Sequence, residues 1–173
     1  MNLFDDDVYE QSPTQDGGAV FSACHRYRYL LYRRWKSNGG GTISFVGLNP
    51  STADAMKDDA TIRRCVGFAK RWGYNRLFML NLFAFRATKP CDMKRQRDPI
   101  GPHNRAYMKR YTGRAKMAVC CWGVNADGFD GVLDDVWLAI KQPMYCSGVT
   151  RSGHPKHPGR LPNAATLRPF TRP

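Results

Sequence analysis

Downstream of residue 42, the sequence alternates short apolar runs with longer segments whose apolar residues recur at helical spacing. Thr42–Leu48 and Leu77–Phe83 have the pattern of buried strands, and Asp58–Gly73 between them has that of an amphipathic helix. Strands that alternate with helices predict an α/β fold, here a three-layer sandwich with a mostly parallel central sheet. The other elements that the pattern predicts are helices over 104–112 and 131–140 and strands over 117–122 and 144–146.

The segments outside this alternation have other patterns. Residues 1–20 are acidic and then polar, which predicts a flexible arm before a single domain over 21–173. Residues 86–104 form a basic loop that is longer than a simple connection requires. Residues 161–173 are rich in proline and are expected to be irregular.

Aromatic and Arg residues alternate from Cys24 to Trp35, a pattern that predicts an amphipathic strand. Its Tyr face is expected either to enter the core or to follow a strand of nucleic acid. Ser37–Gly41 is a turn-forming sequence. We therefore expect this strand to form a hairpin with Thr42–Leu48.

The charge is strongly positive and unevenly distributed. The chain has a formal net charge of +13, yet its first 16 residues contain five acidic residues and no Lys or Arg. Residues 17–173 thus carry 27 basic and nine acidic side chains, a formal charge of +18. Eighteen of the bases are Arg, whose planar guanidinium suits phosphate recognition. Nucleic acid is the expected partner, and a merely soluble basic protein is the alternative.

Several classes of protein are not favoured. The longest apolar runs are too short to span a bilayer, and the acidic N-terminus is unlike a secretory signal. The six cysteines form no CxxC pattern and lie mostly in apolar stretches, as reduced thiols do. We expect a cytoplasmic monomer with no membrane partner, no cofactor and no metal.

The segments that follow the predicted strands are polar and glycine-rich. They are 47–54, 81–88, 122–128 and 147–160. Because the carboxyl ends of parallel strands meet at one edge of a sheet, these segments are expected to converge on a ligand site.

Two Asn residues at strand ends are candidates for that site. Asn49, in the sequence Gly47-Leu48-Asn49-Pro50-Ser51, would present an amide to a cleft, although Asn-Pro-Ser is also an ordinary turn. Asn81 interrupts an apolar strand and would read the edge of a planar base with a donor and an acceptor. Hydrogen bonding to the backbone is the structural alternative.

Acidic residues and histidines supply the other candidates. Asp54, Asp58 and Asp59 lie close after the first of these motifs. Helix capping explains them, but Asp59 would also stabilise cationic charge or activate water. His154 and His157 lie in a basic loop that lacks the further ligands of a zinc site, so an oxyanion or a phosphate is the more economical partner.

The sequences GLNPS, NLFAFRAT and SGHPKHP, in this order, resemble the uracil-DNA glycosylase superfamily. The resemblance covers about residues 25–160 and is nearest to the mismatch-specific and single-strand-selective branches. The stretch 47–88 also resembles a bacterial and phage family that we take to be a divergent branch. The implied fold is that of the superfamily, and the implied activity is hydrolysis of an N-glycosidic bond in DNA.

The resemblance implies a role for individual residues. Asn49 would position the hydrolytic water, Asn81 would read the flipped base, and His154 would lie against the leaving base or a phosphate. Lys156 and His157 fall where the superfamily inserts an apolar wedge, and this sequence departs from that pattern because both side chains are polar. Ser51 replaces the Tyr of the classical enzymes and leaves room for a 5-substituent.

The sequence therefore predicts a metal-free, monofunctional DNA glycosylase that excises a modified or mismatched pyrimidine. Repair, defence against phage with modified DNA and phage-encoded processing are all open as its role. The alternatives are a non-catalytic DNA-binding protein and a nucleoside hydrolase, which would not need so basic a body. The expected catalytic residues are Asn49, Asp59 and His154; the expected base-binding residues are Gly47, Leu48, Ser51, Asp54, Asp58 and Asn81; the expected DNA contacts are Arg63, Arg86, Arg151, Ser152, Lys156 and His157.

Overall fold

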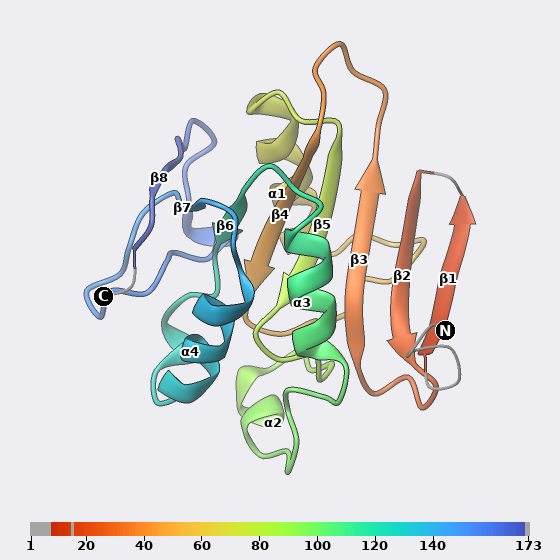
Figure 1. The fold of residues 1–173 in the computed structure, drawn as a ribbon, viewed down its shortest axis with the longest axis vertical. Coiled ribbons are helices and arrows are strands. Elements are labelled where there is room, and N and C mark those ends of the chain that lie inside the picture. Colours follow the sequence, from red (N-terminus) through yellow and green to blue (C-terminus); the bar gives the residue numbers. More distant parts are fainter. Residues whose placement is uncertain (1–7, 15, 172–173) are drawn as a thin grey trace.

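A computed structural model describes residues 8–14 and 16–171. In these residues the fold is α/β, with eight strands in one sheet and four α-helices (Figure 1). The strands are β1 (Val8–Thr14), β2 (Gly17–Ser22), β3 (Arg28–Arg34), β4 (Thr42–Gly47), β5 (Arg76–Asn81), β6 (Ala118–Cys120), β7 (Met144–Cys146) and β8 (Arg168–Pro169). The helices are α1 (Ala60–Arg71), α2 (Pro90–Lys94), α3 (Asn104–Thr112) and α4 (Asp130–Ala139).

The sheet is mixed, with its parallel strands at the centre. The strand order is β1-β2-β3-β5-β4-β6-β7-β8. β5, β4, β6 and β7 are parallel to one another, whereas the pairs on either side are antiparallel. From β4 the chain first reaches β5 on one side and later β6 on the other. The sheet therefore has a topological switch point between β4 and β6.

Helices cover both faces of the sheet, which gives two separate cores. α3 and α4 lie on the face that is in front in Figure 1, and α1 lies on the opposite face. The helical spacing of Ile62, Cys65 and Phe68 places all three in the core beneath α1. The predicted α/β architecture with a parallel sheet centre is confirmed.

Two predictions about the N-terminal half are wrong. Residues 8–14 and 16–20 do not form a flexible arm, because they belong to a hairpin whose second strand pairs with β3. Residues 1–7 and 15 of the predicted arm lie outside the described residues. β3 does not pair with β4 either, because β5 lies between them and pairs with both.

The remaining segments agree with expectation more closely. The long loop over 86–104 contains only the short helix α2, and 161–171 contains only the two-residue strand β8. Cys65, Cys120, Cys121 and Cys146 are buried free thiols, whereas Cys24 and Cys91 are exposed. Within the described part of the chain, no helix combines the length and the apolarity needed to span a membrane.

Candidate functional site

A cavity of about 900 Å³ lies at the switch point, where β4, β5 and β6 end. Its volume falls in the range of small-molecule and cofactor sites, about 300–1,000 Å³. Each of the four segments that follow the predicted strands contributes residues to the lining, so their predicted convergence is observed. The sequence-predicted residues that line the cavity are Gly47, Leu48, Asn49, Ser51, Asp59, Asn81, Lys156 and His157.

Asn49 presents a hydrogen-bond acceptor to the cavity. Its Nδ2 donates to the carbonyl oxygen of Ala87 at 2.7 Å and to that of Pro50 at 3.0 Å, so both amide hydrogens are engaged. No group of the described residues donates to its Oδ1. The side chain is thus fixed by backbone partners, and Oδ1 is the atom left for a water or a ligand.

Asn81 presents the opposite functionality. Its Oδ1 accepts from Nη2 of Arg28 at 3.3 Å, and its Nδ2 lies beside Gly47. A Cβ atom at position 47 would lie 2.9 Å from that Nδ2, so glycine provides the space for the amide. Asn81 was expected to offer both a donor and an acceptor to a base. Because the oxygen is turned toward Arg28, the end of the amide that lies beside the cavity-lining Gly47 is the donor Nδ2.

Arg28 is a buried cation in the wall of the cavity. It is 3% exposed, and Nη1 donates to the carbonyl oxygen of Ala53 at 2.9 Å, so both of its hydrogen bonds go to uncharged oxygens. Burial lowers the pKa of this guanidinium to about 10, and the opposite charge of Asp59 limits the shift. The group therefore remains protonated near neutral pH.

Asp59 combines a structural role with a place at the cavity. As the N-cap of α1, its Oδ1 accepts from the backbone N–H of Ile62 at 2.8 Å. No hydrogen bond within the described residues occupies its Oδ2. The predicted capping and the predicted place at the site are both observed, because one carboxylate oxygen suffices for the cap.

His157 lines the cavity beside the first turn of α1. Its Nδ1 accepts from the backbone N–H of Gly159 at 3.1 Å, so in the neutral ring Nε2 carries the proton and faces Oγ1 of Thr61 at 3.4 Å. Burial lowers the pKa of His157, while Asp59 opposes the shift. Exposed Lys156 and Arg160 lie beside it and give this side of the cavity a positive charge.

His154, the expected catalytic histidine, does not line the cavity. Its Nδ1 accepts from Nε1 of Trp122 at 3.3 Å, and its Nε2 donates to Asp127 at 2.6 Å. The loop turns tightly here, since the backbone N–H of Thr150 donates to the carbonyl oxygen of His154. The ring is thus bonded to Trp122, which does line the cavity. The structure thus places His154 outside the cavity lining, and its expected contact with a leaving base or a phosphate stays a prediction.

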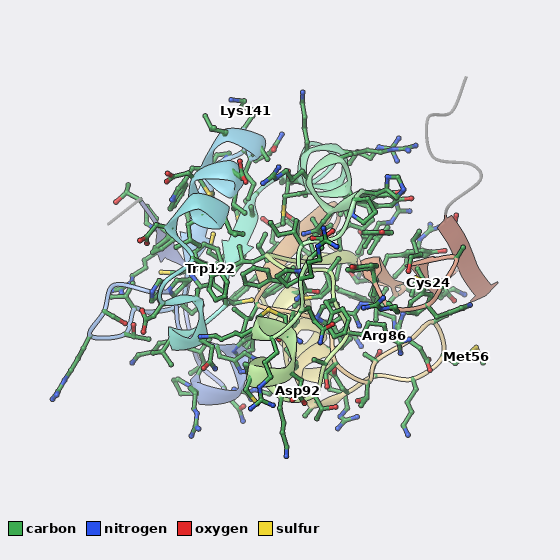
Figure 2. All side chains as sticks on the ribbon, turned by 90° about the horizontal axis from the view of Figure 1, so that it is seen from below. Cys24, Met56, Arg86, Asp92, Trp122 and Lys141 are labelled. Carbon is green, nitrogen blue, oxygen red and sulfur yellow. The ribbon has the colours of Figure 1, made fainter. Side chains whose placement is uncertain are left out.

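Two of the three acidic residues after β4 also lie outside the cavity. Asp54 closes a turn, with its Oδ1 accepting from the backbone N–H groups of Met56 and Lys57. Met56 is 70% exposed at the tip of this loop and lies at the periphery of the molecule in Figure 2. Asp58 pairs with Arg33 at 2.8 Å. Both carboxylates therefore hold the loop rather than a base.

The predicted DNA contacts Arg63 and Arg86 have intramolecular partners. Arg63 donates to a main-chain carbonyl just before α1. Arg86 lies over the ring of Phe21 and so attaches the N-terminal hairpin to the segment after β5. Arg151 and Ser152 are exposed on the loop after β7, outside the cavity lining. Of these four, the two loop residues are the better placed for an external partner.

Sequence reasoning missed several residues of the site. Arg28 was visible only as a basic residue inside a strand whose neighbours are apolar, and such a residue needs a buried partner. Trp122 lies near the carboxyl end of a buried strand, as Asn49 and Asn81 do, and this position was the signal that could have identified it. Other lining residues carry no sequence signal of their own, and Thr61, Val124 and Arg160 are examples.

Comparisons with known proteins give a family and no function. No group of three or more His, Cys, Asp or Glu in the described part of the chain is placed to hold a metal ion. No curated protein and no solved structure matches the chain. The sequence model of one family, described as "Protein of unknown function (DUF1643)", matches residues 28–159. Because the match spans well over half of the sequence and nearly all of the cavity lining, the chain belongs to the DUF1643 family.

Proposed function

We propose that this protein is a DNA glycosylase that takes a flipped pyrimidine into the cavity and hydrolyses its N-glycosidic bond. The observation that carries the proposal is the joint presence of three fixed groups in one cavity. These are an acceptor on Asn49, a donor on Asn81 and the carboxylate of Asp59. Hydrolysis of such a bond needs a held water, a contact to the leaving base and negative charge near the sugar.

The size of the cavity supports a base larger than uracil. A volume of about 900 Å³ exceeds what an unmodified pyrimidine fills, and Ser51 adds little bulk to the wall. The wall also carries hydroxyl groups, which suit a polar substituent. A modified pyrimidine is therefore the favoured substrate. Besides the groups already described, the uncharged polar side chains in the lining are Ser51, Thr52, Thr61, Thr88, Asn125 and Thr150.

The proposed reaction assigns one task to each fixed group. The bond between C1′ and the base nitrogen breaks, and its electron pair leaves with the base, whose charge the N–H of Asn81 stabilises. The carboxylate of Asp59 stabilises the cationic sugar that remains. A water held by Oδ1 of Asn49 forms the new C1′–O bond and gives up one proton, which the departing base accepts. An amide is too weak a base to take this proton, so Asn49 orients the water only.

The charge of the protein supports DNA as the carrier of the base. Lys156 and Arg160 are exposed at the cavity, and Arg151 is exposed on the same loop as Lys156. Residues 17–173 carry a formal charge of +18, which a small neutral substrate would not require. A nucleotide flipped from the stack would reach the cavity while these side chains contact the flanking phosphates.

The test is incubation of the protein with DNA duplexes and single strands that each contain one altered pyrimidine. The set contains uracil, mismatched thymine, 5-hydroxymethyluracil and glycosylated 5-hydroxymethylcytosine. Alkali then breaks the strand at any abasic site. We expect alkali-dependent breaks at the altered position with at least one of these bases. The absence of breaks with all of them, together with salt-dependent binding, would instead indicate a non-catalytic DNA-binding protein.

A further inference from the structure

Three neighbours fix the position of Asn81. The side chain of Asn104 is buried, and its Nδ2 donates to the backbone carbonyl oxygens of Asn81 and Leu82 at 3.0 and 2.9 Å. Arg28 holds the side-chain oxygen of Asn81, and Gly47 leaves space for the side-chain nitrogen. The strand end, the amide oxygen and the amide nitrogen of Asn81 therefore each have their own constraint.

Arg28 is the group that decides which way this amide faces. A guanidinium has only hydrogen-bond donors, so the atom that it meets on Asn81 must be the oxygen. Exchanging the two ends of the amide would place an N–H group against a buried cation. The second hydrogen bond of Arg28, to Ala53, prevents the guanidinium from turning away. Asn81 is thereby set as a donor toward the cavity.

The depth of Asn81 indicates which edge of a base it meets. Asn81 lines the cavity, yet it is only 3% exposed, at the carboxyl end of the central strand β5. A flipped pyrimidine remains attached to DNA through its sugar, so its far edge, including the 4-position, reaches deepest. The 2-carbonyl, which all pyrimidines share, stays near the sugar.

We infer that Arg28 is a specificity-determining positioning residue, which makes the cavity select a 4-carbonyl pyrimidine over a 4-amino pyrimidine. This inference rests on the proposed function, since it takes the ligand to be a flipped base. The fixed N–H of Asn81 donates to a 4-carbonyl oxygen but meets only another donor in a 4-amino group. Arg28 itself acts through Asn81 and does not need to touch the base.

The experiment compares the binding of two duplexes that differ in one nucleotide. That nucleotide carries 5-hydroxymethyluracil in one duplex and 5-hydroxymethylcytosine in the other, in both cases on a 2′-fluoroarabino sugar. The fluorine opposes the cationic state of the sugar, so the bond to the base persists and binding alone is measured. By fluorescence anisotropy, we expect the wild-type protein to bind the uracil duplex about tenfold more tightly. Equal affinities, or a preference for the cytosine duplex, would overturn the inference.

Variants then assign the preference to Arg28. Arg28→Met is expected to reduce the ratio of the two affinities to within about threefold, and Arg28→Lys, which keeps the charge, is expected to restore part of it. Arg34→Met is the matched control, because Arg34 is exposed on the same strand. A ratio that is unchanged in a folded Arg28→Met protein would overturn the inference. If that variant does not melt cooperatively, the wild-type ratio decides.

The probes keep this test separate from that of the proposed function. Because the fluorinated duplexes resist cleavage, the affinity ratio does not depend on whether the protein is an enzyme. If the protein excises no base from DNA without the fluorinated sugar, the proposed glycosylase activity is refuted. The ratio of the two affinities still tests the role of Arg28. Active excision with equal affinities would refute the role of Arg28 alone.

Discussion

The floor and the mouth of the cavity are built on different principles. We define the floor as Arg28, Asn49 and Asn81, and the mouth as Lys156 and Arg160. Backbone carbonyls and one another's polar atoms fix the side chains of the floor. The mouth consists of exposed cations, which water and salt screen. Under the proposed function, the floor would select the base and carry out the chemistry, and the mouth would make reversible contacts with phosphates.

The largest expected effect comes from removing the acceptor in the floor. Asn49→Ala deletes the atom that would hold water, so we expect kcat for base release to fall about 10²–10⁴-fold. Binding of uncleavable DNA should change little, because the mouth is intact. Single-turnover kinetics and anisotropy measure the two quantities. Asn38→Ala, at an exposed turn, is the control. Loss of binding together with activity would remove the distinction between floor and mouth.

A smaller loss is expected from removing the charge of Asp59. Asn caps helices about as well as Asp does, so Asp59→Asn should leave the melting temperature nearly unchanged. It should lower kcat about 10²-fold, because the carboxylate no longer stabilises the cationic sugar. Asp58→Asn is the adjacent control, since Asp58 pairs with Arg33 outside the cavity. Equal activities of the two variants would exclude Asp59 from the chemistry.

A methyl group added beside Asn81 tests the geometry of the floor without removing a polar group. In Gly47→Ala the new Cβ would lie 2.7 Å from Cε of Met79 and 2.9 Å from Nδ2 of Asn81, which forces both to shift. We expect a loss of stability of about 1–3 kcal/mol and a roughly tenfold loss of activity. Gly67→Ala is the contrasting variant. Gly67 lies within α1, and a Cβ atom at this position would meet no other side chain or distant backbone atom within 4 Å. Denaturant titration should find that variant at least as stable as the wild type.

The mouth should respond to salt rather than to the identity of the base. Removing Lys156 and Arg160 together by substitution with Ala should weaken DNA binding. Each lost phosphate contact should make the dependence of log affinity on log salt shallower by about 0.9. The kcat value should stay within about twofold. Lys141→Ala, outside the cavity lining, serves as the control for net charge. A change of base preference in the double variant would contradict the division of roles.

The smallest effect concerns acid stability at His157. Because burial holds the pKa of this ring below its unfolded value, the neutral ring favours the folded state. That contribution is complete above about pH 6.5 and is lost as the pH falls toward the folded pKa. His157→Gln should therefore lose less stability than the wild type between neutral pH and mildly acidic pH. Denaturant titrations across this range measure the difference, and parallel curves would contradict it.

The sequence predicted those parts of the site that depend on strand ends. Asn49 lies just after β4 and Asn81 is the last residue of β5, and a parallel sheet necessarily brings such ends together. The pairing of β3 with β5 was not predictable from the turn at 37–41, because a turn fixes neither the partner nor an inserted strand. Arg28 was missed for the same reason, since its buried partners come from β5 and from the loop after β4.

His154 and His157 show the limit of motif spacing. They are three residues apart in one loop, yet His154 accepts a hydrogen bond from Trp122 outside the cavity lining and His157 lines the cavity. The difference arises from the tight turn that bonds Thr150 to His154, which no pattern in the sequence specifies. The resemblance implied a role for His154, whereas the residues of this loop that line the cavity are Thr150, Lys156, His157 and Arg160.

The most direct test of the account is mass spectrometry of the small molecules released from modified DNA. Wild-type protein and Asn49→Ala protein are incubated with equal amounts of duplex containing 5-hydroxymethyluracil, and the free base and abasic sites are quantified. The account predicts one free base for each abasic site with the wild type and almost none with the variant. Release of a nucleotide or nucleoside, or equal release by both proteins, would contradict it.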